Sequence, residues 1–274
     1  MRSWLVACVR RVPWLQRMTF HGVILYQHVN GWWRYGDWNL FRTVSIEISQ
    51  HCNRSCPYCP NALYPRPKRF MADALYKRIV ERLQEMQWNG VVDFIFYNEP
   101  LLDPRVPQLV RQLKASVPNC IPRIVSNGDL LTEALFRELI DAGVERFWIS
   151  RHQPVPDGWD ARMRSFQEEH PGLLAVTDLL EVQEKQGLHT RAGLVKVDKE
   201  FKAPICTTPE SAQHIDIEGN LLLCCNDYHR AHPMGNIKTG SILDIWNGIN
   251  YSTLRSELRS GRACLDICKQ CLLQ

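Results

Sequence analysis

From residue 44 onward, segments typical of β-strands alternate with segments typical of α-helices, and this alternation constrains the fold more than any other feature. Short apolar runs are separated by stretches with apolar residues at helical spacing. The expected strands are 44–49, 91–96, 121–125, 144–149, 173–176 and 189–195, and the expected helices are 73–87, 106–117, 132–143 and 161–169. Such alternation predicts an α/β fold with a parallel sheet and right-handed crossovers. Six strands fit a partial parallel (β/α)6 barrel, in which chemistry occurs at the carboxyl ends of the strands.

The loop after the first expected strand carries Cys52, Cys56 and Cys59 in a CxxxCxxC spacing. Thiolates hold iron–sulfur clusters, and a [4Fe–4S] cluster normally takes four of them. A loop with only three thiolates leaves one iron free to bind a small molecule, as in reactive rather than structural metal sites. A zinc knuckle is the alternative, although zinc motifs more often pair two CxxC units.

This spacing, with Tyr58 before the third cysteine, resembles the radical S-adenosylmethionine (SAM) superfamily. The resemblance implies a [4Fe–4S] cluster whose open iron binds SAM and which, when reduced, cleaves SAM to a 5′-deoxyadenosyl radical. It also implies SAM contacts from residues that follow successive strands, with Glu99 of the Tyr97–Pro100 segment in the place of the family's GGEP acid. The expected cofactor-binding residues are Tyr58, Glu99, Ser126, Asn127, Arg151, His152 and Arg191. Each has an ordinary surface interpretation, and only their joint placement favours a site.

A second set of cysteines lies in the last quarter of the chain, around an expected hairpin with Gly219 in its turn. The set comprises Cys206, Cys224, Cys225, Cys264, Cys268 and Cys271. This arrangement resembles the twitch domain, the shortened form of the SPASM extension of radical SAM enzymes. The resemblance implies a small C-terminal β-hairpin and helix domain with an auxiliary [4Fe–4S] cluster, ligated by Cys206, Cys224, Cys268 and Cys271. Two alternatives stay open, because Cys264 could replace Cys268 and the set could instead hold a structural zinc.

Two residues beside the second cysteine set are candidates for catalysis. Cys225 follows an expected ligand and is either a spare thiol or a hydrogen-atom donor to a substrate radical, as a cysteine is in radical SAM epimerases. Asp227 is a candidate base toward a substrate alcohol or amine.

The sequence suggests three regions: an N-terminal arm over 1–43, a barrel over 44–203 and a cluster domain over 204–274. The first 40 residues hold five arginines, one aspartate and five of the nine tryptophans. Such a basic, aromatic arm either packs over the barrel edge or contacts a membrane surface, nucleic acid or an anionic substrate, and packing is favoured because no amphipathic period is visible. No secretion signal and no run of ~18 apolar residues are present. We therefore expect no membrane span, and the clustered cysteines indicate a reducing cytoplasm. No nucleic-acid partner is expected.

We therefore expect an enzyme that abstracts a C–H hydrogen from a small polar natural product, such as a sugar, aminocyclitol or nucleoside, and that epimerises or dehydrogenates it. A flavodoxin- or ferredoxin-type protein would supply the electron. One alternative is a maturase or epimerase of a ribosomally made peptide, although about 43 residues before the first strand are few for a leader-binding domain. The other alternative is a non-catalytic iron–sulfur carrier or scaffold, which would need no SAM-binding residues.

Overall fold

The computed structural model describes residues 41–202, 206–260 and 265–271, together with six residues between 22 and 33. The predicted basic arm over 1–43 therefore falls almost entirely outside the described residues, as does Cys264.

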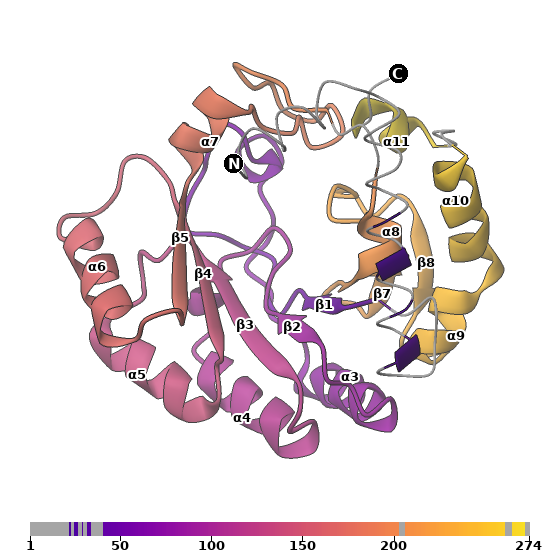
Figure 1. The fold of residues 1–274 in the computed structure, drawn as a ribbon, viewed down its shortest axis with the longest axis horizontal. Helices are drawn as coiled ribbons and strands as arrows, with labels where there is room; N and C mark the ends of the chain where they lie inside the picture. Colours follow the sequence, from indigo (N-terminus) through magenta and orange to yellow (C-terminus); the bar gives the residue numbers. More distant parts are fainter. Residues whose placement is uncertain are drawn as a thin grey trace.

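A single eight-stranded sheet runs through the molecule and curves into an open ring (Figure 1). Its strand order is β5-β4-β3-β2-β1-β6-β7-β8. The strands are β1 (Thr43–Ile46), β2 (Val91–Asp93), β3 (Ile121–Ser126), β4 (Arg146–Arg151), β5 (Leu174–Asp178), β6 (Ala212–Ile215), β7 (Asn220–Leu222) and β8 (Pro233–Asn236). Strands β1 to β5 are parallel, β6 is parallel to β1, and β7 and β8 are antiparallel. The prediction of a partial parallel barrel followed by a C-terminal hairpin is thus confirmed.

Four helices cover the outer face of the parallel strands (Figure 1). They are α3 (Asp73–Glu85), α4 (Val106–Ser116), α5 (Glu133–Ala142) and α6 (Trp159–Glu169). Helix α5 begins where the Thr132 hydroxyl accepts a hydrogen bond from the Leu135 amide at 3.2 Å, and it ends at Gly143, whose φ of +107° suits glycine. Helix α3 has Ala72 as its N-cap residue. Asp73 lies in the first turn, where its charge complements the helix dipole.

Aromatic side chains form the core between the sheet and these helices. Phe136 of α5 is 1% exposed, stacks on Phe166 of α6 at 4.1 Å between ring centroids, and contacts Phe147 of β4 at 4.8 Å. Apolar residues at helical spacing on α3 and α4 continue this core toward β1 and β2.

The C-terminal region extends the same sheet, and its helices pack beside β7 and β8 (Figure 1). These helices are α8 (Thr208–Ser211), α9 (Ile242–Asn247), α10 (Ile249–Arg259) and α11 (Asp266–Cys271). Gly219 occupies the turn between β6 and β7 with φ of +87°. Tyr251 of α10 donates to the carbonyl of Leu222 at 2.7 Å, which fixes the helix on the hairpin. Because β6 pairs with β1, the cluster domain and the barrel share one sheet.

The predicted strand over 189–195 is wrong. Arg191 and Ala192 have φ of +53° and +57°, in the left-handed region that cannot continue a strand. Helix α7 (Leu179–Lys185) follows β5, and Leu188 then makes an isolated parallel bridge with Glu200. The sixth parallel strand is β6, which joins the opposite edge of the barrel.

Among the residues that the structure describes, no helix has both the length and the apolar character needed to cross a membrane.

Candidate active site between two cysteine-lined cavities

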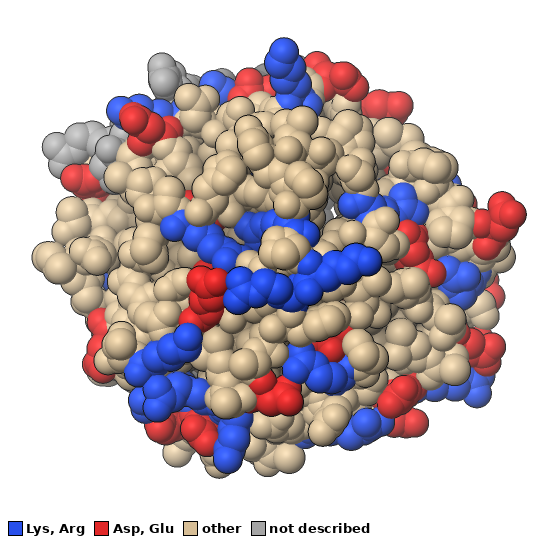
Figure 2. Space-filling view, turned by 180° about the vertical axis from the view of Figure 1, so that it is seen from behind, with Lys and Arg blue, Asp and Glu red and all other residues tan. Residues whose placement is uncertain are grey.

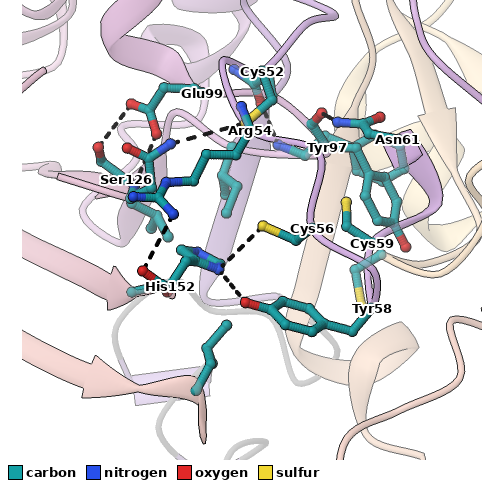
Figure 3. A pocket seen from close by; sticks show the side chains of 18 of the residues that line it. Cys52, Arg54, Cys56, Tyr58, Cys59, Asn61, Tyr97, Glu99, Ser126 and His152 are labelled. Atoms are coloured by element: carbon teal, nitrogen blue, oxygen red, sulfur yellow. Dashed lines mark hydrogen bonds between the residues drawn. The ribbon is translucent and has the colours of Figure 1, made fainter. Parts of the chain in front are cut away.

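A cavity of about 310 Å³ lies at the carboxyl ends of the barrel strands. Its walls come from the ends of β1, β3, β4 and β6 and from the loops that follow β1, β2, β3 and β4, and they are completed by Leu179, Arg191 and Cys225. Cys52, Cys56 and Cys59 all line it (Figure 3). This is the edge of the sheet at which the sequence predicted the metal centre.

The three cysteines provide a donor set that fits an iron–sulfur cluster. All three are free thiols on one loop, and the Cys59 amide donates to the Cys56 carbonyl at 2.9 Å. Burial is the main cause that raises the pKa of Cys52 to about 11, with smaller contributions from Glu99 and from the nearby thiols of Cys56 and Cys59. Thiolates crowded in this way need a cationic centre to neutralise them, which the iron of a cluster supplies.

An arginine inside the cysteine loop anchors it to the loops after β3 and β4. Arg54 makes a bidentate ion pair with Asp129, with both nitrogen–oxygen distances at 2.7 Å. It also donates to the carbonyl of His152 at 3.3 Å (Figure 3) and to that of Pro154 at 2.9 Å. The ion pair of Arg54 with Asp129 was not predicted from the sequence, although a charged residue between two cysteine ligands is a signal that a partner is needed.

Glu99 organises the loops after β2 and β3 from a buried position, at 1% exposure. One carboxylate oxygen accepts from the Ser126 hydroxyl at 2.8 Å and from the Leu101 amide at 3.0 Å. The other accepts from the Asn127 amide at 2.9 Å, and the Asn127 side chain reaches Asn53 of the cysteine loop at 2.8 Å. Burial raises the pKa of Glu99 to about 7, while these hydrogen bonds oppose the rise. All three hydrogen bonds that its carboxylate accepts serve loop geometry, so Glu99 fixes the shape of the site.

Tyr58 and His152 form a stacked pair on another wall of the cavity (Figure 3). The Tyr58 hydroxyl lies 2.7 Å from Nδ1 of His152, and the two rings are 5.9 Å apart with planes at 15°. The Cys56 sulfur is 3.6 Å from the same nitrogen. Burial lowers the pKa of His152 to about 4, so its ring is neutral at neutral pH. The pair presents a flat aromatic surface beside the cysteines.

Two of the predicted site residues do not line either cysteine-lined cavity. Arg151 pairs with Asp160 at 2.8 Å and with Asp178 at 3.0 Å, and these contacts fix it between β4, β5 and α6. Asp227 is 2% exposed and accepts from two backbone amides, at 2.9 and 3.0 Å, of the turn that follows it. The structure therefore gives Arg151 and Asp227 local structural contacts and does not bring them to the cavities.

A second cavity, of about 210 Å³, lies in the C-terminal region. The four predicted auxiliary ligands line it together: Cys206, Cys224, Cys268 and Cys271. Asn226 supports two of them, because its backbone amide donates to Cys224 at 3.4 Å and its side chain donates to Cys271 at 3.2 Å. Burial raises the pKa of Cys206 and Cys224, so a cationic centre is again needed to hold them as thiolates. The donor set fits an iron–sulfur cluster.

Arg191 and Cys225 stand in the walls of both cavities. The left-handed turn at Arg191 presents this residue between the two sites, which a strand at 189–195 would not have done. The two cysteine sets therefore face a shared boundary, and a molecule bound in the first cavity would lie close to the second.

A buried ion network joins the barrel to the cluster domain. Glu47, after β1, is fully buried and accepts from Arg66 at 2.5 Å and from Arg230 at 2.6 Å. Arg66 lies over the ring of Tyr228 at 4.1 Å and donates to its carbonyl. The Tyr228 hydroxyl donates to Asn61 of the cysteine loop at 2.9 Å. These contacts connect the two cysteine-bearing loops, and no local sequence signal indicated them.

Comparison with protein-family models finds two matches. Residues 46–168 match the Radical SAM superfamily, and residues 206–272 match SPASM, an iron-sulfur cluster-binding domain. The chain is 31% identical over 239 residues to the S-adenosyl-L-methionine-dependent 2-deoxy-scyllo-inosamine dehydrogenase of Niallia circulans, which covers 85% of this chain and 93% of the relative.

Two solved structures show the same fold. BtrN in complex with AdoMet and 2-DOIA superposes with a TM-score of 0.76 at 29% identity, covering 84% of this chain and 92% of BtrN. The structure of anSMEcpe with bound AdoMet gives a TM-score of 0.57 at 13% identity, covering 83% of this chain and 87% of that one, and shows a likeness of fold alone.

Proposed function

Because this chain belongs to the radical SAM superfamily and carries a SPASM-type iron–sulfur domain, we propose that it oxidises a ring alcohol of a small aminocyclitol to a ketone. The observation that carries the proposal is the shared boundary of the two cysteine-lined cavities at Arg191 and Cys225. A substrate in the first cavity would lie beside the second cavity. Transfer of an electron from the substrate to a cluster in the second cavity requires such proximity. The similar dehydrogenase acts on 2-deoxy-scyllo-inosamine, and BtrN binds 2-DOIA, which supports this substrate class.

Cys52, Cys56 and Cys59 would hold the SAM-binding cluster, and the four C-terminal cysteines would hold the second one. When bound, the first group supplies a 5′-deoxyadenosyl radical that takes a hydrogen atom, and the second supplies an electron acceptor. The chain itself fixes the geometry: Arg54 anchors the cysteine loop, Glu99 shapes the loops after β2 and β3, and Tyr58 with His152 offers a flat surface for a planar group.

The experiment uses anaerobically reconstituted protein with SAM, dithionite and 2-deoxy-scyllo-inosamine. We expect equal amounts of 5′-deoxyadenosine and ketone, measured by liquid chromatography and mass spectrometry. The control is Cys56→Ala, which should form neither product because the first cluster loses a ligand. Formation of 5′-deoxyadenosine by the wild type without ketone would refute dehydrogenation of this substrate.

Epimerisation is a second candidate, because the Cys225 thiol lines the cavity in which a substrate radical would form. A thiol there could return a hydrogen atom to the opposite face of the carbon. In D2O the thiol carries deuterium, so an epimerase would yield product of unchanged oxidation level with one deuterium per turnover. Full product formation by Cys225→Ala would exclude this role.

We further propose a cytoplasmic setting and a flavodoxin- or ferredoxin-type electron donor. Lysine and arginine side chains form a band across the face of the molecule opposite to that of Figure 1 (Figure 2). Such a band suits an acidic carrier protein, since complementary charge accelerates encounter. Reduction of the clusters by an acidic flavodoxin should then slow as salt is raised, in stopped-flow measurements of the flavodoxin semiquinone.

A further inference from the structure

One histidine in the wall of the first cavity has an unsatisfied ring nitrogen. His214 lies on β6, where it pairs with Ser45 of β1, and it is 7% exposed. Its Nε2 is buried, and no hydrogen bond from the described residues reaches it. A buried polar atom without a hydrogen-bond partner costs free energy. Because His214 lies in the wall of a cavity, this points to a ligand that forms the missing hydrogen bond with its ring.

Three other polar side chains of this cavity are occupied or unsuitable as proton acceptors. Both oxygens of Glu99 already accept hydrogen bonds from Ser126, Leu101 and Asn127. The Nδ1 atom of His152 is engaged by Tyr58. Arg191 is a guanidinium, which stays protonated in proteins and has no acceptor atom.

The environment of His214 keeps its ring in the neutral form. Burial lowers the pKa of His214 to about 4, and no charged side chain contributes to this shift. The ring is therefore neutral at neutral pH, with one nitrogen as donor and the other as acceptor. Phe96, whose ring lies 6.3 Å from that of His214, forms an apolar neighbour.

We infer that His214 binds the substrate hydroxyl on the carbon that is oxidised and accepts its proton. This role rests on the proposed dehydrogenation. The carbon loses a hydrogen atom to the adenosyl radical, the oxygen loses its proton to His214, and one electron passes to the iron–sulfur group of the SPASM domain, so that the C–O bond becomes C=O. An epimerase leaves the hydroxyl intact and needs no such acceptor, so this role separates the two reactions.

Tyr97 supports a polyol ligand from the same cavity. It is 8% exposed, and its hydroxyl is buried without a hydrogen-bond partner among the described residues. The rings of Tyr97 and His214 both lie against Phe96, at 4.8 Å and 6.3 Å respectively. A donor and an acceptor placed around one apolar ring suit two hydroxyl groups of one cyclitol.

The test compares the wild-type holoenzyme with His214→Gln, His214→Asn and His214→Leu. The matched control is His170→Gln, because His170 packs against Phe136 on the far side of the barrel and lines neither cavity. Glutamine retains a polar atom at the end of the side chain but cannot take a proton. Binding of 2-deoxy-scyllo-inosamine is measured by calorimetry with SAM present and no reductant, and 5′-deoxyadenosine and ketone are measured after reduction. Circular dichroism and iron content verify that each variant is folded and loaded.

We expect His214→Gln to bind the substrate within about tenfold of the wild type and to form ketone at least about 100-fold more slowly, as for loss of a general base. The ratio of 5′-deoxyadenosine to ketone should rise well above one, and His170→Gln should match the wild type. His214→Leu should lose both binding and ketone.

Three results would overturn the assignment. If all three His214 variants form ketone at the wild-type rate, His214 takes no part. If His214→Gln loses binding but retains one 5′-deoxyadenosine per ketone, His214 binds the substrate without accepting its proton. If the wild type itself forms no ketone, the proposed function fails, and this role of His214 fails with it.

Discussion

The ion pair between Arg54 and Asp129 should contribute measurably to the stability of the cysteine loop. Their side chains are 13% and 11% exposed, and they share two hydrogen bonds of 2.7 Å. Breaking a buried ion pair costs about 3–5 kcal/mol. Arg54 keeps its contacts with two backbone carbonyls, and both side chains retain some solvent, so we expect Asp129→Asn to lower the free energy of unfolding by about 2–3 kcal/mol.

A double-mutant cycle isolates this interaction. Arg54→Gln, Asp129→Asn and the double variant are compared by anaerobic urea denaturation, followed by circular dichroism. We expect a coupling energy of about 2 kcal/mol. The matched control is the Glu133–Arg137 pair on α5, whose side chains are 65% and 62% exposed and whose coupling should be about 0.3–0.5 kcal/mol.

The Asp129→Asn substitution should also affect the metal centre, because Arg54 lies between Cys52 and Cys56 in the chain. A change of about 2 kcal/mol in local opening corresponds to about 30-fold in the open population. Removal of iron by a chelator should therefore accelerate by up to that factor in Asp129→Asn, as followed by loss of visible absorbance. A coupling energy below about 0.5 kcal/mol, with an unchanged rate of iron loss, would show that the clamp does not hold the loop.

Three further outcomes follow from the packing and from the cysteine sets. Phe136→Ala should destabilise the fold by about 3–5 kcal/mol in urea denaturation, because it removes a fully buried ring; a loss below about 1 kcal/mol would contradict this packing. Gly219→Ala should cost about 1–3 kcal/mol, since φ is +87° and a Cβ atom there would lie 2.8 Å from a neighbouring side chain; an unchanged melting temperature would argue against this turn. The Cys268→Ala/Cys271→Ala double variant should lose one cluster's worth of iron and labile sulfide while 5′-deoxyadenosine formation persists; full iron retention would exclude both residues as ligands.

Much of the site followed from local sequence signals. The spacing of Cys52, Cys56 and Cys59 after a strand placed the metal loop at the carboxyl edge of the sheet, where the cavity lies. The expected helix over 132–143 has its caps at Thr132 and Gly143 in the structure, because a cap depends on the side chain and backbone of a single turn. The sequence also predicted that the four cysteines that line the second cavity form one set. Cys264, the alternative ligand, lies outside the described residues.

Other features depended on contacts between distant segments, which local sequence patterns do not report. The segment 189–195 was expected to form a strand, but the left-handed backbone at Arg191 excludes a strand there and presents this residue between the two cavities. Arg151 follows a strand as a cofactor ligand would, yet Asp160 and Asp178 pair with it. A lone arginine carries no sign of which carboxylates the fold will bring to it.

The sequence by itself determined the alternating strands and helices, both cysteine sets and the chemistry that thiolates of this spacing support. These features depend on residue type and on spacing within a few tens of residues. Only the tertiary structure decided that β6 joins β1 across the sheet and that one ion network around Glu47 ties the two cysteine-bearing loops together. It also decided that His214 lies in the cavity wall with no hydrogen bond to its Nε2 from the described residues. Each of these depends on burial and on pairing between segments more than 150 residues apart, as the register of Ser45 with His214 shows, and such pairing is set by the packing of the whole chain.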